Sequence, residues 1–308
     1  MMMRPRPLRP GDTIAIISPA TTVREEYIDG AARLLKGAGY RVRVMPHAKG
    51  PADGTFAATA ADRLADFTEA YLDPQVRAIL CTRGGYGCVH LIDSIPPQML
   101  AADPKWVIGF SDVSALHAMM LHAGAMSLHA PMAKHLTTLG ADNAYTRALL
   151  NALTTTADIS YTCAAHPLNR LGAADGQLRG GNLAVLNGLA DTPYDILHVS
   201  SGTPTVLFIE DIAEKVYAVE RMLTRLALSG SLQRAAGLIV GAFTEYTPDK
   251  NHSSMEEMID RLLTRRGIDI PVSFGFPVGH TDINAALVEG AQCRLDVGSA
   301  EVKLTIYA

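Results

Sequence analysis

Lys105-Trp-Val-Ile-Gly-Phe-Ser-Asp-Val-Ser-Ala-Leu-His117 is the stretch of sequence that decides the fold. It predicts a buried strand that stops at a glycine, a tight turn that holds Ser111, and an apolar helix over residues 113–122. A serine at a strand–turn–helix bend has the geometry of a nucleophile elbow. The first amides of the helix and the positive end of its dipole can stabilise an oxyanion there. The alternative is that Ser111 or Asp112 only caps the helix.

The rest of the first half also alternates between strands and helices. Strands separated by helices imply a parallel sheet that is covered on both faces. The pattern predicts strands over residues 12–19, 41–45 and 76–81, and helices over residues 25–36, 60–71 and 143–153.

The second half has a different character. Residues 154–175 are polar and rich in Ala and Thr, without clear periodicity, and predict a linker between an N-terminal domain (1–153) and a C-terminal domain (176–308). The latter is expected to be a smaller, β-rich α/β domain. Its predicted strands cover residues 206–209, 237–243, 271–277 and 301–307, and its helices cover 222–228 and 255–266.

Composition narrows the class of protein. The chain has 308 residues, of which 48% are hydrophobic and 19% charged, as in soluble globular enzymes. No apolar run approaches the ~20 residues that span a bilayer, and a net charge of −4 gives no general attraction to nucleic acid. The four cysteines are scattered without a CxxC pair, which suits reduced thiols in a cytoplasm. No histidine pair has metal-ligand spacing, so we expect neither a metal nor a cofactor.

Two glycine-rich segments could contact a ligand. Cys81-Thr-Arg-Gly-Gly-Tyr-Gly-Cys88 follows a strand, and its amides could cradle an anion or line an oxyanion hole. It matches no nucleotide-binding motif, and a plain tight turn is the alternative. Arg83 within it would suit a substrate carboxylate. The second segment, Gly176-Gln-Leu-Arg-Gly-Gly-Asn182, suggests a close approach of the backbone to a ligand or another domain.

Glu210 and His280 could supply the partners of a serine nucleophile. Glu210 ends the apolar run 206–209, at the strand end where ligand sites collect in open α/β sheets. His280 lies in a loop bounded by Gly and Pro. A serine needs an imidazole to take its proton and a carboxylate to orient the imidazole. The alternatives are a solvated loop histidine and, for the neighbouring Asp211 and Glu214, an acidic helix cap.

With these residues the chain resembles the LD-carboxypeptidases, or murein tetrapeptide carboxypeptidases. The similarity runs from residue 11 to the His280 loop, and six marks in the same order make it specific. They are Arg83-Gly-Gly-Tyr-Gly87, Gly109-Phe-Ser-Asp112, Gly180-Gly-Asn-Leu183, Leu207-Phe-Ile-Glu-Asp211, Glu220-Arg-Met-Leu223 and Phe276-Pro-Val-Gly-His280.

The resemblance implies a serine peptidase with the triad Ser111, Glu210 and His280. It also implies a flavodoxin-like, glutamine-amidotransferase-like N-terminal domain, a β-rich C-terminal domain and, often, a homodimer. Family members remove the terminal D-alanine from cytoplasmic muropeptide tetrapeptides during peptidoglycan recycling. The backbone amides of Gly85 and Asp112 would form the oxyanion hole. The resemblance further suggests substrate contacts at Arg83, Gly84 and Asn182.

Three other functions are open. One branch of the same family cleaves amide or acyl-sulfamate bonds of microcin-type peptide-nucleotides, which is expected to need an aromatic platform, and the single tryptophan, Trp106, falls in a buried strand. A non-catalytic muropeptide-binding module on the same fold is the second. The third is a cysteine-based amidotransferase with its nucleophile at Cys81 or Cys88, neither of which lies at the predicted bend.

Overall fold

The structure is a computed structural model that describes residues 2–200, 202 and 204–308. The chain forms two compact units. The first comprises the residues up to Thr156 together with Ala285–Glu289, and the second comprises Ala157–Asn284 and Gly290–Ala308. The first unit is therefore discontinuous in sequence, because a short segment from late in the chain belongs to it.

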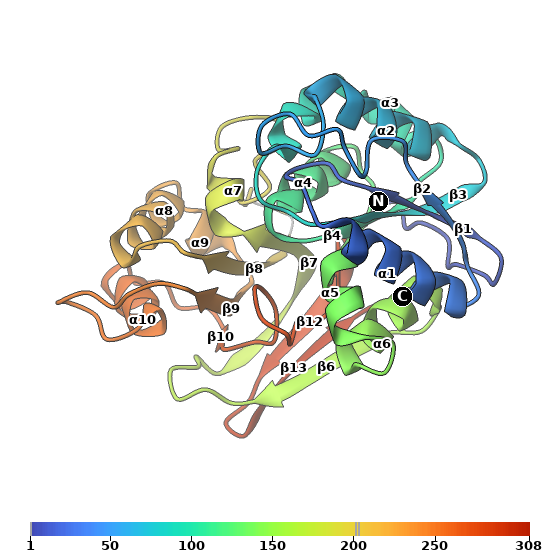
Figure 1. Ribbon diagram of the computed structural model, residues 1–308. Coiled ribbons are helices and arrows are strands. Elements are labelled where there is room, and N and C mark those ends of the chain that lie inside the picture. Colours follow the sequence, from blue (N-terminus) through green and yellow to red (C-terminus); the bar gives the residue numbers. More distant parts are fainter. Residues whose placement is uncertain (1, 201, 203) are drawn as a thin grey trace. The chain divides into compact units, whose positions relative to one another are not determined.

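The first unit is built on a six-stranded sheet with the order β11-β5-β4-β3-β1-β2. Figure 1 labels its strands β1, β2, β3 and β4. The first five strands along the chain pair in parallel, whereas β11 pairs with β5 antiparallel. The parallel order 2-1-3-4-5 is that of flavodoxin-like folds, so the predicted fold class is confirmed. The strands are β1 (Thr13–Ile17), β2 (Arg41–Val44), β3 (Val76–Cys81), β4 (Trp106–Gly109), β5 (Ser127–His129) and β11 (Leu287–Glu289).

Helices separate the parallel strands of this unit, as the alternating pattern predicts. Helix α1 buries Ile28, Ala31 and Leu35 at helical spacing, and the Thr59 side chain caps α2 by accepting from the Asp62 amide at 3.2 Å. The α-helices are α1 (Glu25–Gly37), α2 (Ala60–Leu72), α3 (Pro97–Ala102), α4 (Ser114–His122), α5 (Ala133–Leu139) and α6 (Ala144–Thr154). Single 3-10 turns lie at η1 (Cys88–His90), η2 (Ile92–Ser94) and η3 (Ser111–Val113).

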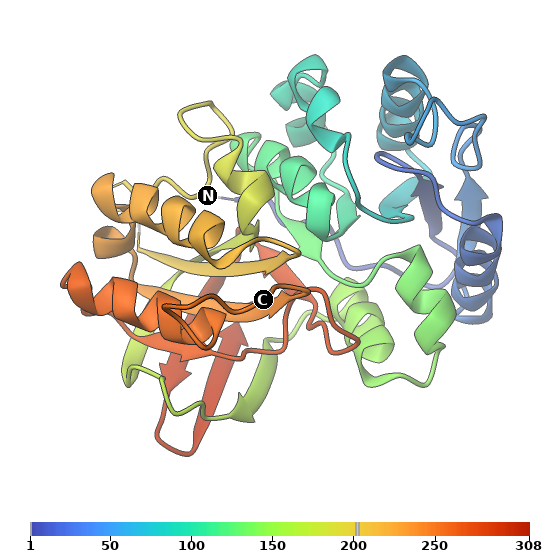
Figure 2. The same ribbon diagram turned by 60° about the vertical axis from the view of Figure 1, so that its left-hand side comes forward.

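The second unit is built on a seven-stranded sheet with the order β10-β9-β8-β7-β12-β13-β6. Strands β10 to β7 run parallel, and the pairs from β7 to β6 are antiparallel. Helices α8 and α10 pack against each other (Figure 2). The strands are β6 (Ile159–Ala164), β7 (Gly172–Asn182), β8 (Thr205–Ile212), β9 (Gly237–Thr244), β10 (Val272–Phe274), β12 (Gln292–Val297) and β13 (Glu301–Ile306). The helices are α7 (Leu183–Asn187), α8 (Val216–Leu228), α9 (Ser231–Arg234) and α10 (Met255–Arg265).

Residues 154–175 differ from the predicted linker. Strand β6 and the start of β7 fall within this stretch, so much of it belongs to the sheet. β6 lies at the sheet edge and buries only one of its six residues, Ile159. An edge strand that buries so little carries no strong apolar alternation, which is why its composition resembles a linker.

Two general features bear on function. Among the helices of the described ranges, none combines the length and apolarity that crossing a bilayer requires. In the part of the chain that the structure describes, no group of three or more His, Cys, Asp or Glu side chains is placed to hold a metal ion.

Candidate active site

Ser111 lies at the bend predicted from the sequence. Strand β4 ends at Gly109, and the helical turn η3 begins at Ser111 and leads into α4. The φ angle of Ser111 is +66°, a left-handed conformation that a serine rarely adopts. The cap positions of η3 and α4 are held by Phe110 and Val113, without side-chain cap bonds. The capping alternative therefore does not explain this serine, and its strained backbone is typical of a functional turn.

The glycine turn after β3 lies directly against Ser111. A Cβ added to Gly84 would come within 2.8 Å of the Ser111 Cβ and Oγ atoms and within 3.0 Å of the Asp112 amide nitrogen. Residue 84 can therefore carry only a hydrogen. The Thr21 hydroxyl, from the loop after β1, donates to the Gly84 carbonyl at 2.7 Å, and Gly85 has a φ of +106°. The carboxyl ends of three parallel strands thus meet at the serine.

The Asp112 side chain joins this turn to the start of the helix. Its buried carboxylate accepts a hydrogen bond from the Cys88 amide at 2.8 Å. Burial raises the pKa of the Asp112 carboxyl, and the Cys88 amide opposes that shift. The bond joins the far end of the glycine turn to the residue that follows Ser111.

Arg63 supports the same turn, although no motif in the sequence predicts this role. Its guanidinium is buried and donates to the carbonyls of Pro19 at 2.6 Å, Gly87 at 2.9 Å and Ala58 at 3.1 Å. Burial lowers its pKa. The available signal was an arginine on the buried face of α2, four residues before the buried Phe67.

Glu210 and His280 form a hydrogen-bonded pair in the second unit. Glu210 lies near the end of β8 and is fully buried, and its Oε2 is 2.6 Å from the Nδ1 of His280. Because a carboxylate only accepts, Nδ1 donates and Nε2 is the nitrogen that can take a proton. Gly279, at a φ of +122°, lets the loop approach closely, since a Cβ there would lie 2.9 Å from that of Glu210. This is the arrangement of a general base with its orienting acid.

The electrostatics of the pair favour a basic imidazole. Burial lowers the pKa of His280, but the hydrogen bond and charge of Glu210, with smaller effects of Asp211 and Glu245, outweigh burial and leave that pKa raised. Burial, followed by the charge of Glu210, raises the pKa of Asp211 to about 6. The imidazole of His280 is thus a stronger base than a free imidazole.

The first unit thus holds the bent serine and the second holds the Glu210–His280 pair. Comparisons with known proteins show the family to which the chain belongs. The family model described as the LD-carboxypeptidase N-terminal domain matches residues 14–130, and the model of the LD-carboxypeptidase C-terminal domain matches residues 175–295. The chain belongs to the LD-carboxypeptidase family. It is thus an enzyme of the carboxypeptidase class, and the predicted resemblance is confirmed.

Individual relatives span the whole chain. A probable murein peptide carboxypeptidase of Bacillus subtilis is 32% identical over 300 residues, which are 95% of this chain and 91% of the relative. The murein tetrapeptide carboxypeptidase of Pseudomonas aeruginosa is 28% identical over 92% of each chain. The crystal structure of muramoyltetrapeptide carboxypeptidase from Oxalobacter formigenes superposes with a TM-score of 0.85 at 30% identity, covering 96% of this chain and 99% of that one.

Asn182, predicted to contact substrate, is engaged within the fold of this LD-carboxypeptidase. Its Oδ1 accepts from the Val185 amide at 3.1 Å and caps α7, and its Nδ2 donates to Asp211 at 2.9 Å. The residue is buried. Asn182 therefore positions the carboxylate next to Glu210, and a direct substrate contact stays a prediction.

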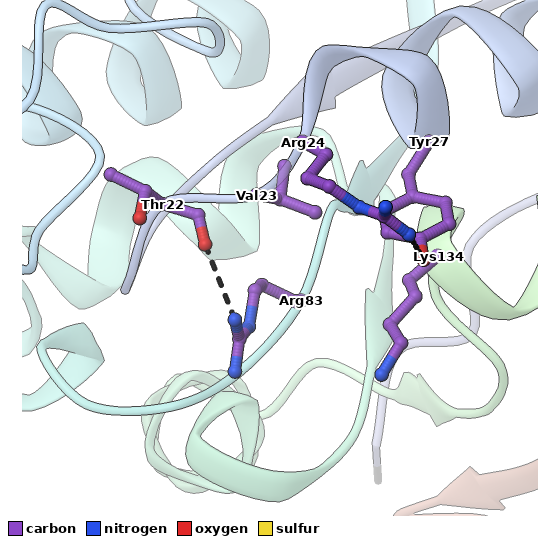
Figure 3. A pocket seen from close by; sticks show the side chains of 6 residues that line it. All are labelled: Thr22, Val23, Arg24, Tyr27, Arg83 and Lys134. Carbon is purple, nitrogen blue, oxygen red and sulfur yellow. Dashed lines mark hydrogen bonds between the residues drawn. The ribbon is translucent and has the colours of Figure 1, made fainter.

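Arg83, the other predicted substrate contact outside the glycines, is exposed. Its guanidinium donates to the Thr22 carbonyl at 3.3 Å and lines a pocket of the first unit (Figure 3). Its chain neighbour Gly84 lies against Ser111, as described above. A substrate contact of Arg83 stays a prediction.

Two alternatives to the family's carboxypeptidase activity lose support. Trp106 is 1% exposed and its indole donates to the Arg6 carbonyl at 3.1 Å, so it offers no platform for a nucleobase. Cys81 and Cys88 are fully buried, and burial raises the pKa of both thiols. Because the thiolate is the nucleophilic form, neither cysteine suits an amidotransferase mechanism.

Substituting Gly84→Ala is expected to lower kcat/KM by about 10²- to 10³-fold, the cost of losing an oxyanion-hole contact. The added methyl group would fill the space beside the Ser111 hydroxyl and the Asp112 amide. Steady-state kinetics measure the loss, and thermal unfolding reports whether the fold persists. The matched control is Gly37→Ala at the end of α1, where a Cβ meets nothing within 4 Å. Equal activity of the two variants would contradict this account of the glycine turn.

The raised pKa of His280 predicts a pH profile. A general base acts in its neutral form, so kcat/KM should fall on the acid side as pH drops through that pKa. Substituting Glu210→Gln removes the charge that raises it, so the acid limb should move to lower pH while the rate also falls. The exposed Glu301→Gln is the control and should leave the limb in place. An unmoved limb in Glu210→Gln would show that another group controls the profile.

Proposed function

We propose that this LD-carboxypeptidase releases the C-terminal D-alanine of murein tetrapeptides by cutting the bond that follows the L-centre of the diamino acid. The observation that carries the proposal is the left-handed Ser111, with Gly84 so close that a Cβ there would lie 2.8 Å from the serine hydroxyl and 3.0 Å from the Asp112 amide nitrogen. The Glu210–His280 pair supports the same chemistry. The names of the murein carboxypeptidase relatives support the substrate class.

In the proposed reaction the three residues act on one bond. The Ser111 hydroxyl attacks the carbonyl carbon of the diamino acid, and His280 Nε2 takes the hydroxyl proton while Glu210 stabilises the imidazolium. The backbone amides of Gly85 and Asp112 bind the oxyanion. Collapse of the intermediate breaks the C–N bond, and His280 gives its proton to the leaving D-alanine amine. A water activated by His280 then hydrolyses the acyl-enzyme.

The setting of the reaction belongs to the same proposal. The chain carries four free thiols, which fit a reducing cytoplasm where muropeptides are recycled. We infer a homodimeric enzyme that works there without a cofactor, as the family resemblance implies. Sedimentation of the purified protein measures the oligomeric state directly.

Mass spectrometry of defined stem peptides tests the function. The purified enzyme is incubated with tetrapeptide, tripeptide and pentapeptide, with Ser111→Ala as the inactive control. Release of D-alanine from the tetrapeptide alone supports the proposal. Release from the pentapeptide would indicate a DD-specific enzyme, and no release from any peptide would refute the assignment. Cleavage of an aminoacyl-sulfamoyl nucleoside instead would indicate the immunity-type activity.

A further inference from the structure

A cation-lined pocket opens on the first unit beside the glycine turn. It has a volume of about 450 Å³, and Figure 3 shows the side chains that line it. Its walls come from the loop after β1, the start of α1, the turn after β3 and the start of α5. These segments come after the carboxyl ends of parallel strands. The lining residues are Thr22, Val23, Arg24, Tyr27, Arg83 and Lys134.

The cations that line this pocket differ in whether they have an acidic partner. Arg24 pairs with Glu26 at 3.0 Å, bonds to the Tyr27 hydroxyl and lies over its ring. Arg83 and Lys134, both exposed, are different. Within residues 2–200, 202 and 204–308, no carboxylate lies within 4.0 Å of either cation, and the only side-chain bond of the pair runs from Arg83 to a backbone carbonyl.

Among the described residues that line the pocket there are cations and no carboxylate, so the lining carries a net positive charge. A guanidinium and an ammonium that lack acidic partners suit a small anion with several acceptor oxygens. A carboxylate is such a group. A lining of this charge favours a negatively charged part of a ligand over a neutral one.

The pocket is linked to the nucleophile through three consecutive residues. The Lys134 amide donates to the Thr82 carbonyl at 3.2 Å, Arg83 follows Thr82, and Gly84 contacts Ser111. Adjacent Cα atoms are about 3.8 Å apart, so the base of Arg83 lies one residue from the turn that contacts the serine. In a peptide cut at its last bond, the terminal carboxylate likewise lies one residue beyond the scissile carbonyl.

We propose that Arg83 and Lys134 bind the terminal carboxylate of the leaving D-amino acid and thereby make the enzyme act at chain ends. This inference rests on the proposed function and adds to it the recognition of the free terminus. It also brings in Lys134, a residue that carries no chemical motif in the sequence. Removing either cation should weaken the binding of a peptide with a charged terminal carboxylate and not that of a peptide with a neutral terminus.

Comparing two tetrapeptides tests this inference, one with a free terminal carboxylate and one with a terminal amide. In Arg83→Met and Lys134→Met, kcat/KM for the acid should fall about 10- to 100-fold, as expected for a hydrogen bond to a charged group, and change little for the amide. Arg83→Lys should keep part of the preference. The control, Lys36→Met, removes an exposed lysine of α1 outside the pocket and should behave like the wild type.

Equilibrium binding makes the same comparison without turnover. In the Ser111→Ala background, calorimetry compares the acid and the amide, so slow cleavage of the amide does not hide the effect. Equal losses for both peptides, or no loss, would overturn the carboxylate subsite while wild-type cleavage still upheld the proposed function. A loss that instead follows amidation of another carboxylate of the stem would also overturn it. If the wild type cleaves neither peptide, the proposed function itself fails.

Discussion

Ser111→Ala is expected to reduce turnover of the tetrapeptide by several orders of magnitude, because it removes the hydroxyl that attacks the scissile carbonyl in the proposed reaction. In serine hydrolases removal of the nucleophile costs about 10⁶ in kcat. A fluorophosphonate probe checks the assignment independently of the substrate, since it labels only an activated serine. The wild type should be labelled once per chain, and Ser111→Ala should not be labelled.

The control for this experiment is Ser94→Ala, which removes an exposed serine of η2. It should be labelled like the wild type. Labelling that persists in Ser111→Ala would place the nucleophile elsewhere. Thermal unfolding of both variants separates a lost nucleophile from a lost fold.

His280→Ala is the second large effect, and it tests whether the two units act on one bond. Without an imidazole the Ser111 hydroxyl keeps its proton, so both turnover and fluorophosphonate labelling should fall by several orders of magnitude. The effects should not add: the double variant with Ser111→Ala should be no slower than Ser111→Ala alone. Stopped-assay kinetics on the two single variants and the double variant measure this double-mutant cycle.

An exposed histidine provides the comparison for His280. His198→Ala should keep the wild-type rate. A near-wild-type rate in His280→Ala would show that the Glu210–His280 pair serves only the second unit's own structure. A slow His280→Ala that still labels fully at Ser111 would point to another base.

Local patterns in the sequence were enough to predict the central feature of the fold. The run before Ser111 is apolar, stops at Gly109 and resumes as an apolar helix, and the structure has a strand, a bend and a helix there. The long helices were predictable for the same reason, since α1 and α10 place their buried residues at helical spacing. Periodicity reports burial directly wherever an element has one apolar face.

Long-range pairings were not predictable from such patterns. Strand β11 has only three residues, too few for a period, and it joins the first unit's sheet from a position late in the chain. Glu210 and His280 are 70 residues apart, and their bond depends on the loop conformation that Gly279 permits. The role of Arg63 was not predictable because its partners are backbone carbonyls, which leave no pattern in the sequence. Tertiary contact decides these features.

The left-handed backbone of Ser111 sets stability against activity at one position. A non-glycine residue in a sparsely populated region of φ/ψ space costs about 1–3 kcal/mol, whereas glycine adopts a φ of +66° without a steric penalty. A library sorted for thermal resistance would therefore favour glycine at this codon, and one sorted for turnover would keep serine. Thermostable forms of the enzyme should be sought at other positions, because the proposed chemistry needs a serine in this left-handed conformation.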